Sequence, residues 1–436
     1  MAKTFQEITP EEFDKFAEKS PISHFQQRSD WADLKKNNGW IPHFLGVKNE
    51  NKLEAAVLIL EKPLPMGRKM FYAPRGPLMD YEDSSLLKFT FKNLKAYAKA
   101  HHAIFLKIDP AIINLERDID GNIVKNGQDN TKIVKTLKSL GLKHHGYNLE
   151  GNMQPQYAFV LNLKEKTEED LLKNLKNTHR TRLRQNEKNH VSVRELKFDE
   201  LDKFKKIMVS TADRRGFTDR PAKYYQDMWV ALKDNLKILV AEVNLNEYKK
   251  SLEEELKPLE DQEKKLKEAL KSTSHKEKIE KQLAALEKSK AGLKTREENL
   301  KSYQKSAEKD GTLTLGALLF VKTKREVTSL FGGAYGEFRE FNAAYSLNWE
   351  MILESLKNGH EKYNFYGISE FKNEKNPNFG LYVFKRGFGG NVEEYIGEFD
   401  LVTSKFWYFL YKLAYELPKS LRRAKNNRKF RKSVQK

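Results

Sequence analysis

The longest regular pattern in the chain is an alternation of apolar and polar positions between residues 246 and 308. Leucines in its first half are spaced by four, three, seven and four residues, with Glu263 at a skipped core position. The second half repeats the pattern, with Lys290 and Glu297 at skipped positions. Alternating threes and fours are typical of a coiled-coil seam, and the polar residues 271–276 indicate a turn. We therefore predict an antiparallel hairpin of two helices of about 25 residues, protruding by roughly 35–40 Å.

Strand-like apolar runs at residues 236–243 and 313–322 flank this hairpin, so both strands are expected in one sheet with the arm inserted in their connection. Before it, the periodicity predicts a helix at 10–18, a strand hairpin at 44–64, a helix at 84–101 and a strand at 103–110. From residue 154 a similar order begins again, with a helix expected over 167–189. The fold class is therefore α/β (α+β), in two related lobes with an inserted arm.

The composition is that of a globular protein. Of 436 residues, 39% are hydrophobic and 32% charged, and there is no cysteine, which excludes disulfide scaffolds, thiolate zinc sites and cysteine nucleophiles. The N-terminus lacks an apolar signal core, and the richest late run, 406–417, is too short for a membrane span and carries Lys412 and Glu416. We expect a cytoplasmic protein, at most peripheral to the inner face of the cell membrane.

The net charge of +19 is unevenly distributed. Residues 419–436 hold nine Lys/Arg and no acid, which favours contact with phosphate in a nucleic acid or an anionic bilayer. A solubilising extension is the alternative interpretation. The predicted arm is nearly neutral, with 16 basic and 14 acidic residues, so it is not primarily an electrostatic grip, and a simple spacer remains an alternative.

The familiar catalytic templates are absent from the sequence. There is no GxGxxG after a strand, no Walker loop, no HExxH and no GxSxG, and we expect no metal and no cofactor. Polar residues do gather near strand ends: Arg75 before a Gly-Pro pair, Asp109 after the strand at 103–110, and Lys385 in a glycine-rich segment after an expected strand. Arg220 and Tyr224 are four apart and would share a helix face. Each of these also has a purely structural interpretation, as a turn, core or surface residue.

Eight strings in the sequence carry a resemblance to a known family. They occur in the order SHFQQRSDWADLKKNNGW, FYAPRGPLMDYED, IDP, GFTDRPAKYY, FGGAYGEFREFNAAYSLNWEMI, KYNFYGISE, FKRGFGG and EYIGEFDL. Together they resemble the FemABX family of peptidoglycan bridge-forming aminoacyltransferases, in its FemA/FemB/MurM-like branch, from about residue 23 to residue 401. The resemblance implies two lobes similar to GCN5-related acetyltransferases, with the helical arm on the second.

The implied domains are a first lobe (1–150), a second lobe (151–245 and 309–401), the arm (246–308), and a C-terminal helix with basic tail (402–436). The implied reaction moves Gly, Ala or Ser from aminoacyl-tRNA onto the stem-peptide lysine, or the growing bridge, of a lipid-linked or UDP-linked peptidoglycan precursor. No metal or redox cofactor is required.

The resemblance also assigns roles by position. Lys35 or the adjacent Lys36, Arg220 and Tyr224 match positions that hold the precursor, and Arg75 is a further candidate contact. Lys385 matches the lysine of the family's FK motif, suited to an oxyanion or the departing ribose oxygen, and Asp109 is a candidate proton acceptor. Tyr335, in GGAY, replaces a residue that is often small in the family, so its contact with the acceptor is a looser expectation.

Two other classes of function stay open from the sequence. A catalytically silent tRNA- or membrane-binding scaffold would keep the same fold. An acyl-CoA-dependent acyltransferase is suggested by the lobes, but the chain lacks the glycine-rich pyrophosphate turn of such enzymes.

Overall fold

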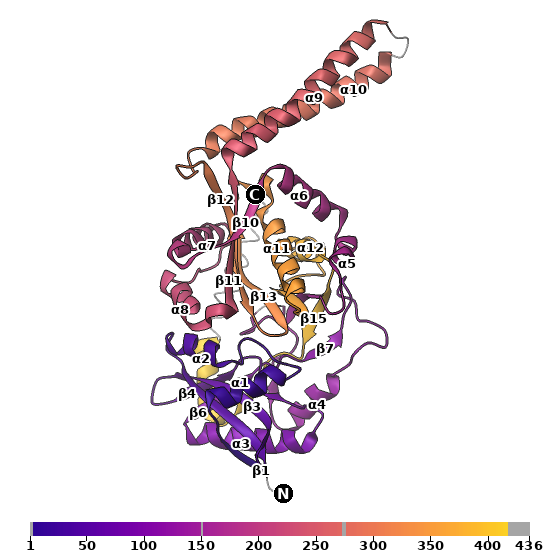
Figure 1. Cartoon of the computed structure of the whole chain (residues 1–436). Helices are drawn as coiled ribbons and strands as arrows, with labels where there is room; N and C mark the ends of the chain where they lie inside the picture. The colour runs from indigo at the N-terminus through magenta and orange to yellow at the C-terminus, as the bar shows by residue number, and fades with distance from the viewer. Residues whose placement is uncertain (1–2, 150, 273–275, 417–436) are drawn as a thin grey trace.

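Two mixed β-sheets form the body of the protein, and a helical arm projects from it (Figure 1). A computed structural model describes residues 3–149, 151–272 and 276–416. Strands form at the runs predicted at 44–64, 103–110, 236–243 and 313–322, and the expected α/β fold of two lobes with an inserted arm is confirmed.

The first sheet has eight strands. Its order is β1 (Lys3–Glu7), β2 (Ile41–Asn49), β3 (Lys52–Pro63), β4 (Lys69–Ala73), β6 (Ala103–Ile108), β16 (Phe399–Val402) and β8 (Lys143–His144), and β5 (Leu78–Met79) pairs with β3. Only β4 and β6 are parallel neighbours, because helix α3 connects them. One face is covered by α3 and α4, whose leucines join the apolar side of the strands. The other face carries α1, α2 and α13.

The second sheet also has eight strands. Its order is β10 (Val191–Glu195), β11 (Leu236–Asn244), β12 (Thr312–Lys322), β13 (Glu326–Ala334), β14 (Lys362–Gly367), β9 (Tyr157–Asn162), β15 (Asn391–Tyr395) and β7 (Ile113–Glu116). Helices α7 and α8 pack on one face with residues of α2, while α5, α11, α12 and the base of the arm pack on the other.

The two sheets exchange strands. β7 precedes residue 150 in the chain but pairs with β15 in the second sheet, whereas β16, near residue 400, pairs with β6 and β8 in the first. The lobes are therefore interleaved, and the chain crosses between them more than once.

The helices have the following bounds. Those on the first sheet are α1 (Pro10–Lys19), α2 (Ser29–Lys36), α3 (Ser84–Ala100), α4 (Thr131–Ser139), α13 (Lys405–Tyr411) and the π-helical turn η4 (Lys412–Glu416). Those on the second are α5 (Glu168–Asn174), α6 (Asn177–Lys188), α7 (Leu201–Arg215), α8 (Ala222–Leu232), α11 (Ala343–Lys357) and α12 (Phe379–Arg386), with short 3-10 turns η1 (Phe198–Glu200), η2 (Lys233–Asn235) and η3 (Arg339–Phe341).

The arm consists of α9 (Leu245–Ser272) and α10 (Lys276–Tyr303), and part of its predicted turn lies outside the described residues. Leu286, Leu293 and Leu300 are buried along the seam. The skipped core positions of the two series meet, because Lys290 Nζ lies 2.6 Å from a carboxylate oxygen of Glu263. The flanking strands β11 and β12 pair antiparallel, as predicted.

Two local expectations are wrong. The helix expected over 167–189 is two helices, because the chain turns extended at buried Leu175 and the Lys176 amide bonds the carbonyl oxygen of Gly387 at 2.9 Å. The strand expected before Lys385 is helix α12. Its aromatic and β-branched residues have strand propensity, but Tyr382 and Lys385 are buried three residues apart on one helical face.

Candidate active site

A cavity of about 500 Å³ lies where the two sheets meet. Its walls come from α2, the segment before β9, the start of α8, β13 and the end of β14. The residues that line it are Gln26, Trp31, Lys35, Leu149, Gly151, Asn152, Met153, Gln154, Pro155, Arg220, Tyr224, Leu330, Phe331, Tyr366, Gly367, Ile368 and Ser369. Residues far apart in the sequence therefore line one cavity. Three of them, Lys35, Arg220 and Tyr224, are site residues predicted from the sequence.

Two cations flank one phenol in this cavity. Lys35 Nζ lies 3.4 Å from the Tyr224 hydroxyl and 4.5 Å from the centre of the Trp31 ring. The Arg220 guanidinium lies 5.3 Å from the Tyr224 ring centre. Burial, with the positive charge of Arg220, lowers the pKa of Lys35 to about 8. Within the described part of the chain neither cation pairs with a carboxylate, so the arrangement suits an anionic ligand.

Lys36 faces away from this cluster. Along α2, Trp31 and Lys35 are four residues apart and point the same way, whereas Lys36 is exposed and does not line the cavity. Arg220 precedes the first residue of α8, Ala222, so its contact with Tyr224 comes from the loop before the helix rather than from one helix face.

Lys385 lies directly behind another part of the wall. Its Nζ donates hydrogen bonds to the carbonyl oxygens of Gly367 at 2.7 Å and Tyr366 at 3.3 Å, both residues of the cavity lining. Burial lowers the pKa of Lys385 to about 7. An ammonium has three donors, so one remains after these two bonds. As an ammonium, Lys385 thus has one donor left for a ligand, and it loses this donor when it deprotonates near neutral pH.

Asp109 is buried one layer behind the cavity and does not line it. It accepts hydrogen bonds from the Tyr72 hydroxyl at 2.8 Å and the Arg75 amide at 2.6 Å. Burial raises the pKa of Asp109 to about 7, against the opposing charge of Arg75. Arg75 in turn donates to the carbonyl oxygen of Pro155 at 2.7 Å and lies 4.3 Å from the Tyr395 ring centre. The pair therefore supports the wall at Pro155.

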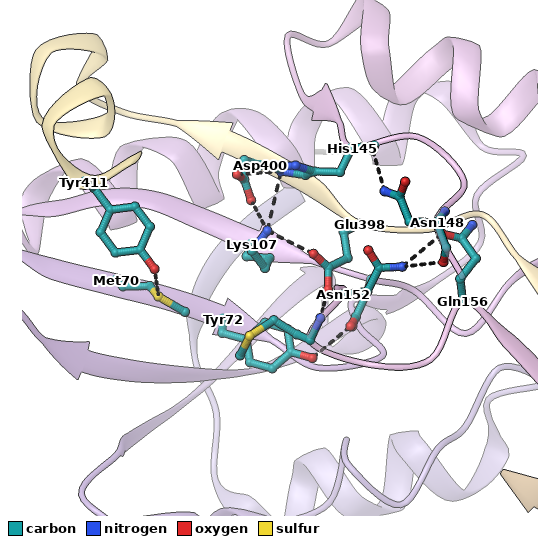
Figure 2. A network of polar contacts seen from close by, with 12 residues as sticks. Met70, Tyr72, Lys107, His145, Asn148, Asn152, Gln156, Glu398, Asp400 and Tyr411 are labelled. Carbon is teal, nitrogen blue, oxygen red and sulfur yellow. Dashed lines mark hydrogen bonds and ion pairs between the residues drawn. The ribbon is translucent and has the colours of Figure 1, made fainter. Parts of the chain in front are cut away.

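A buried ion cluster of Lys107, His145, Glu398 and Asp400 also contacts the segment that forms this wall (Figure 2). Lys107 Nζ lies 3.2 Å from Glu398 and 2.9 Å from Asp400, and His145 Nε2 lies 2.7 Å from Asp400. The second oxygen of Glu398 accepts a hydrogen bond from the amide of Met153, a cavity residue. Although burial opposes it, the His145 contact and the Lys107 charge lower the pKa of Asp400 to about 2. The cluster thus fixes the 151–155 segment to strands β6 and β16.

Tyr335 is not part of this site. It follows β13, its ring packs 5.7 Å from that of Phe338, and it does not line the cavity. The geometry brings together Lys35, Arg220 and Tyr224, with Lys385, Asp109 and Arg75 behind the walls, and leaves out Lys36 and Tyr335.

Residues that the sequence did not single out also shape the cavity. Tyr366 takes a left-handed backbone (φ 63°), and its hydroxyl donates to Gln154 Oε1 at 2.6 Å, closing the wall between β14 and the 151–155 segment. Its string, KYNFYGISE, contributes to the resemblance, but nothing in the string distinguishes this tyrosine from its neighbours. For Trp31 the sequence did contain a signal, because a residue four positions before Lys35 shares its helix face.

The described residues contain no group of three or more His, Cys, Asp or Glu side chains placed to hold a metal ion. Across residues 3–149, 151–272 and 276–416, no helix is both long and apolar enough to cross a membrane.

Comparisons of this chain with a family model, with related sequences and with solved structures agree. The model of the FemAB family matches residues 8–416. Aminoacyltransferase FemA of Staphylococcus aureus strain N315 is 33% identical over 410 residues, which is 93% of this chain and 97% of that protein, and FemA of strain bovine RF122 / ET3-1 is equally similar. The crystal structure of FemX aligns with a TM-score of 0.72 at 24% identity, over 95% of this chain and all of that one. The expected enzyme class, an aminoacyltransferase, is thereby confirmed, and the chain belongs to the FemAB family.

Proposed function

We propose that this protein transfers an amino acid, Gly, Ala or Ser, from aminoacyl-tRNA to an amine of a peptidoglycan precursor. The acceptor amine is the stem-peptide lysine or the end of a growing bridge, on a lipid-linked or UDP-linked precursor. The observation that carries this proposal is the pair of cations Lys35 and Arg220, neither bound to a carboxylate of the described residues, in a cavity whose wall at Gly367 accepts a hydrogen bond from buried Lys385. The two cations suit the precursor's phosphates, and the ammonium of Lys385 suits a developing oxyanion.

The reaction is an aminolysis of an ester. The neutral acceptor amine attacks the aminoacyl carbonyl, an amide bond forms, the ester C–O bond breaks, and the ribose oxygen leaves with a proton. A free lysine amine has a pKa near 10.4, so a site must supply its neutral form. Asp109 is proposed to favour that form through the Tyr72 hydroxyl, and the charged form of Lys385 is proposed to stabilise the oxyanion with its remaining donor.

Incubation of the protein with a mixture of charged tRNAs and each form of precursor tests the proposal. We expect the precursor's mass to increase by one Gly, Ala or Ser residue. No mass increase with any charged tRNA, under conditions where the protein is folded, would contradict it. The setting we propose is the cytoplasm, with peripheral contact at the inner membrane face; the basic tail proposed for that contact lies outside the described residues.

Lys35 and Lys36 form a matched pair for the acceptor site. Lys35→Ala should raise the KM for the precursor by about tenfold or more, with a smaller effect on kcat, because a charge-assisted bond to phosphate is lost. Lys36→Ala should change either constant by less than about twofold. Because the pKa of Lys35 is about 8, the wild-type KM should also rise as pH increases through that value. Equal effects of both substitutions would contradict the assignment.

Helix α6 supports a site for the donor tRNA. It is anchored to the segment that carries Lys385, because the Lys176 amide bonds the Gly387 oxygen at 2.9 Å and His179 Nε2 lies 2.8 Å from the Phe384 oxygen. Arg182 and Arg184 are exposed on this helix, and neither pairs with a carboxylate within the described residues. A phosphate backbone lying along α6 would bring its 3′ end toward Lys385.

The double substitution Arg182→Gln/Arg184→Gln should therefore weaken tRNA binding, and more at low salt than at high salt. The slope of log K against log salt should decrease by about two, because two phosphate contacts no longer release counterions. The control is Lys132→Gln/Lys135→Gln, on the exposed face of α4, which should leave the slope unchanged. Binding isotherms over a salt series measure both, and an unchanged slope in the α6 variant would remove α6 from the donor site.

A further inference from the structure

The last helical segment exposes an apolar face that nothing in the described chain covers. Phe406 is 64% exposed, Phe409 60%, Leu413 47% and Leu410 37%. Counted from Phe406, the others lie three, four and seven residues on, so all four lie on one side of α13 and η4. We refer to these four residues as the α13 surface.

The opposite side of the segment is firmly packed. Tyr408 is buried, and the rings of Tyr408 and Tyr411 lie 5.4 and 5.0 Å from that of Phe105 in β6. Trp407 is covered by the Arg68 guanidinium, 4.6 Å from its ring centre. Because the helix is attached through this side, the α13 surface is exposed as a consequence of how the helix sits on the sheet.

Two cations contact the packed side of the segment. Arg68 and Lys143 contact the aromatic rings of the same segment, Lys143 at 4.9 Å from the Tyr408 ring centre. Met66, in the turn that carries Arg68, is 79% exposed. In the sequence the segment continues into the nine Lys/Arg of residues 419–436, with no acid among them. Exposed aromatic and aliphatic side chains beside a dense set of cations are the features of a site at the boundary of an anionic bilayer.

We propose that the α13 surface docks into the headgroup region of an anionic lipid bilayer. The sequence favours this occupant, because nine Lys/Arg and no acid follow the segment in residues 419–436, and anionic lipid is complementary to them in charge. An apolar face and a polybasic segment also supply the two signals that stable peripheral binding needs. Docking at this surface rests on the proposed function in one respect only: it benefits transfer if the acceptor is a lipid-linked precursor.

The docking helix is connected to the active-site wall. The Tyr408 hydroxyl donates to Asp400 at 2.6 Å. Asp400 pairs with Lys107, and Lys107 pairs with Glu398 (Figure 2). Glu398 in turn accepts from the Met153 amide, so a continuous chain of polar contacts links the surface to the cavity wall. A bilayer held at α13 has a fixed position relative to the cavity.

Co-sedimentation of the full-length protein with phosphatidylcholine vesicles, with and without phosphatidylglycerol, tests this proposal. The wild type should bind only the vesicles that contain phosphatidylglycerol, and Phe406→Ser/Phe409→Ser should weaken binding by at least about tenfold. The matched control is Ile123→Ser/Val230→Ser, two similarly exposed apolar residues elsewhere, which should bind as the wild type. Removal of residues 419–436 should also weaken binding, more at low salt than at high salt.

Binding of the Phe406→Ser/Phe409→Ser variant equal to that of the wild type would overturn the proposal. So would wild-type binding that ignores lipid charge, or a change of oligomeric state in the variant without any vesicle binding by the wild type. Transfer to a UDP-linked precursor should be unchanged in this variant. If the wild type transfers nothing but binds anionic vesicles, the proposed function fails and the docking surface stands.

Discussion

Replacing Lys385 by methionine is expected to lower kcat for aminoacyl transfer by about 10²–10³-fold, the usual effect of removing one donor from an oxyanion site. The protein should remain folded, because methionine fills a similar volume and a buried ammonium is costly. The pKa of Lys385, about 7 in the folded state, is below the value near 10.4 of an unfolded chain. Folding thus opposes the charged form, and the penalty is greatest below pH 7 and disappears as pH rises toward 10.4. The variant's free energy of unfolding at low pH should equal or exceed that of the wild type.

The control is Arg386→Met, because Arg386 is next on the same helix but pairs outward with Asp120. In this control, single-turnover transfer should show full activity, and denaturant unfolding should show that the protein is folded. The alkaline limb of the kcat profile, which we expect near pH 7 from loss of the Lys385 charge, should be absent in Lys385→Met. A Lys385→Met enzyme that retains wild-type kcat would contradict a role in transition-state stabilisation.

Replacing Asp109 by asparagine is the second change with a large expected effect. If the ionised carboxylate favours the neutral acceptor amine, kcat should decrease by about 10²-fold, and the acidic limb of the pH profile should disappear. Asparagine can keep both hydrogen bonds, accepting from the Arg75 amide and donating to Tyr72. A wall-supporting role alone would instead raise the KM for the precursor and leave the acidic limb in place, so the profile separates the two roles.

The same substitution makes a prediction for stability. The folded pKa of Asp109 is about 7 and that of an unfolded aspartate about 3.9, so the group's contribution to stability is complete below pH 3.9 and decreases as pH rises to 7. The full difference amounts to about 4 kcal/mol. Relative to the wild type, Asp109→Asn should therefore be more stable at about pH 8 than at about pH 4. Urea unfolding at both pH values measures this, with Asp80→Asn, an exposed aspartate of the same lobe, as the control.

Local patterns made much of the fold predictable. The heptad spacing predicted the arm, and the apolar runs beside it form paired strands. The contact between the skipped positions Glu263 and Lys290 was not predicted, because the spacing within each helix does not fix the register between them. Prediction failed where a distant contact decides the conformation. Helix α12 has the composition of a strand, and only burial of Tyr382 and Lys385 against the second sheet makes the helix favourable.

The site was predictable where spacing or resemblance supplied a residue. Arg220 and Tyr224 do meet, although the helix begins later than expected. The choice between Lys35 and Lys36 needed the direction of α2 relative to the cavity. The support of Met153 by Glu398 joins residues 245 positions apart, and no local pattern carries such a contact.

The exchange of strands between the two sheets has a consequence for how the chain folds during synthesis. β6 pairs with β4 on one side, but its other edge is completed only by β16. A ribosome delivers β16 after almost the entire polypeptide has emerged, so the first lobe waits with an open, apolar edge while the second is being made. Unpaired edges of this kind invite pairing with other nascent chains, and a chaperone that shields the edge until translation ends would favour correct assembly.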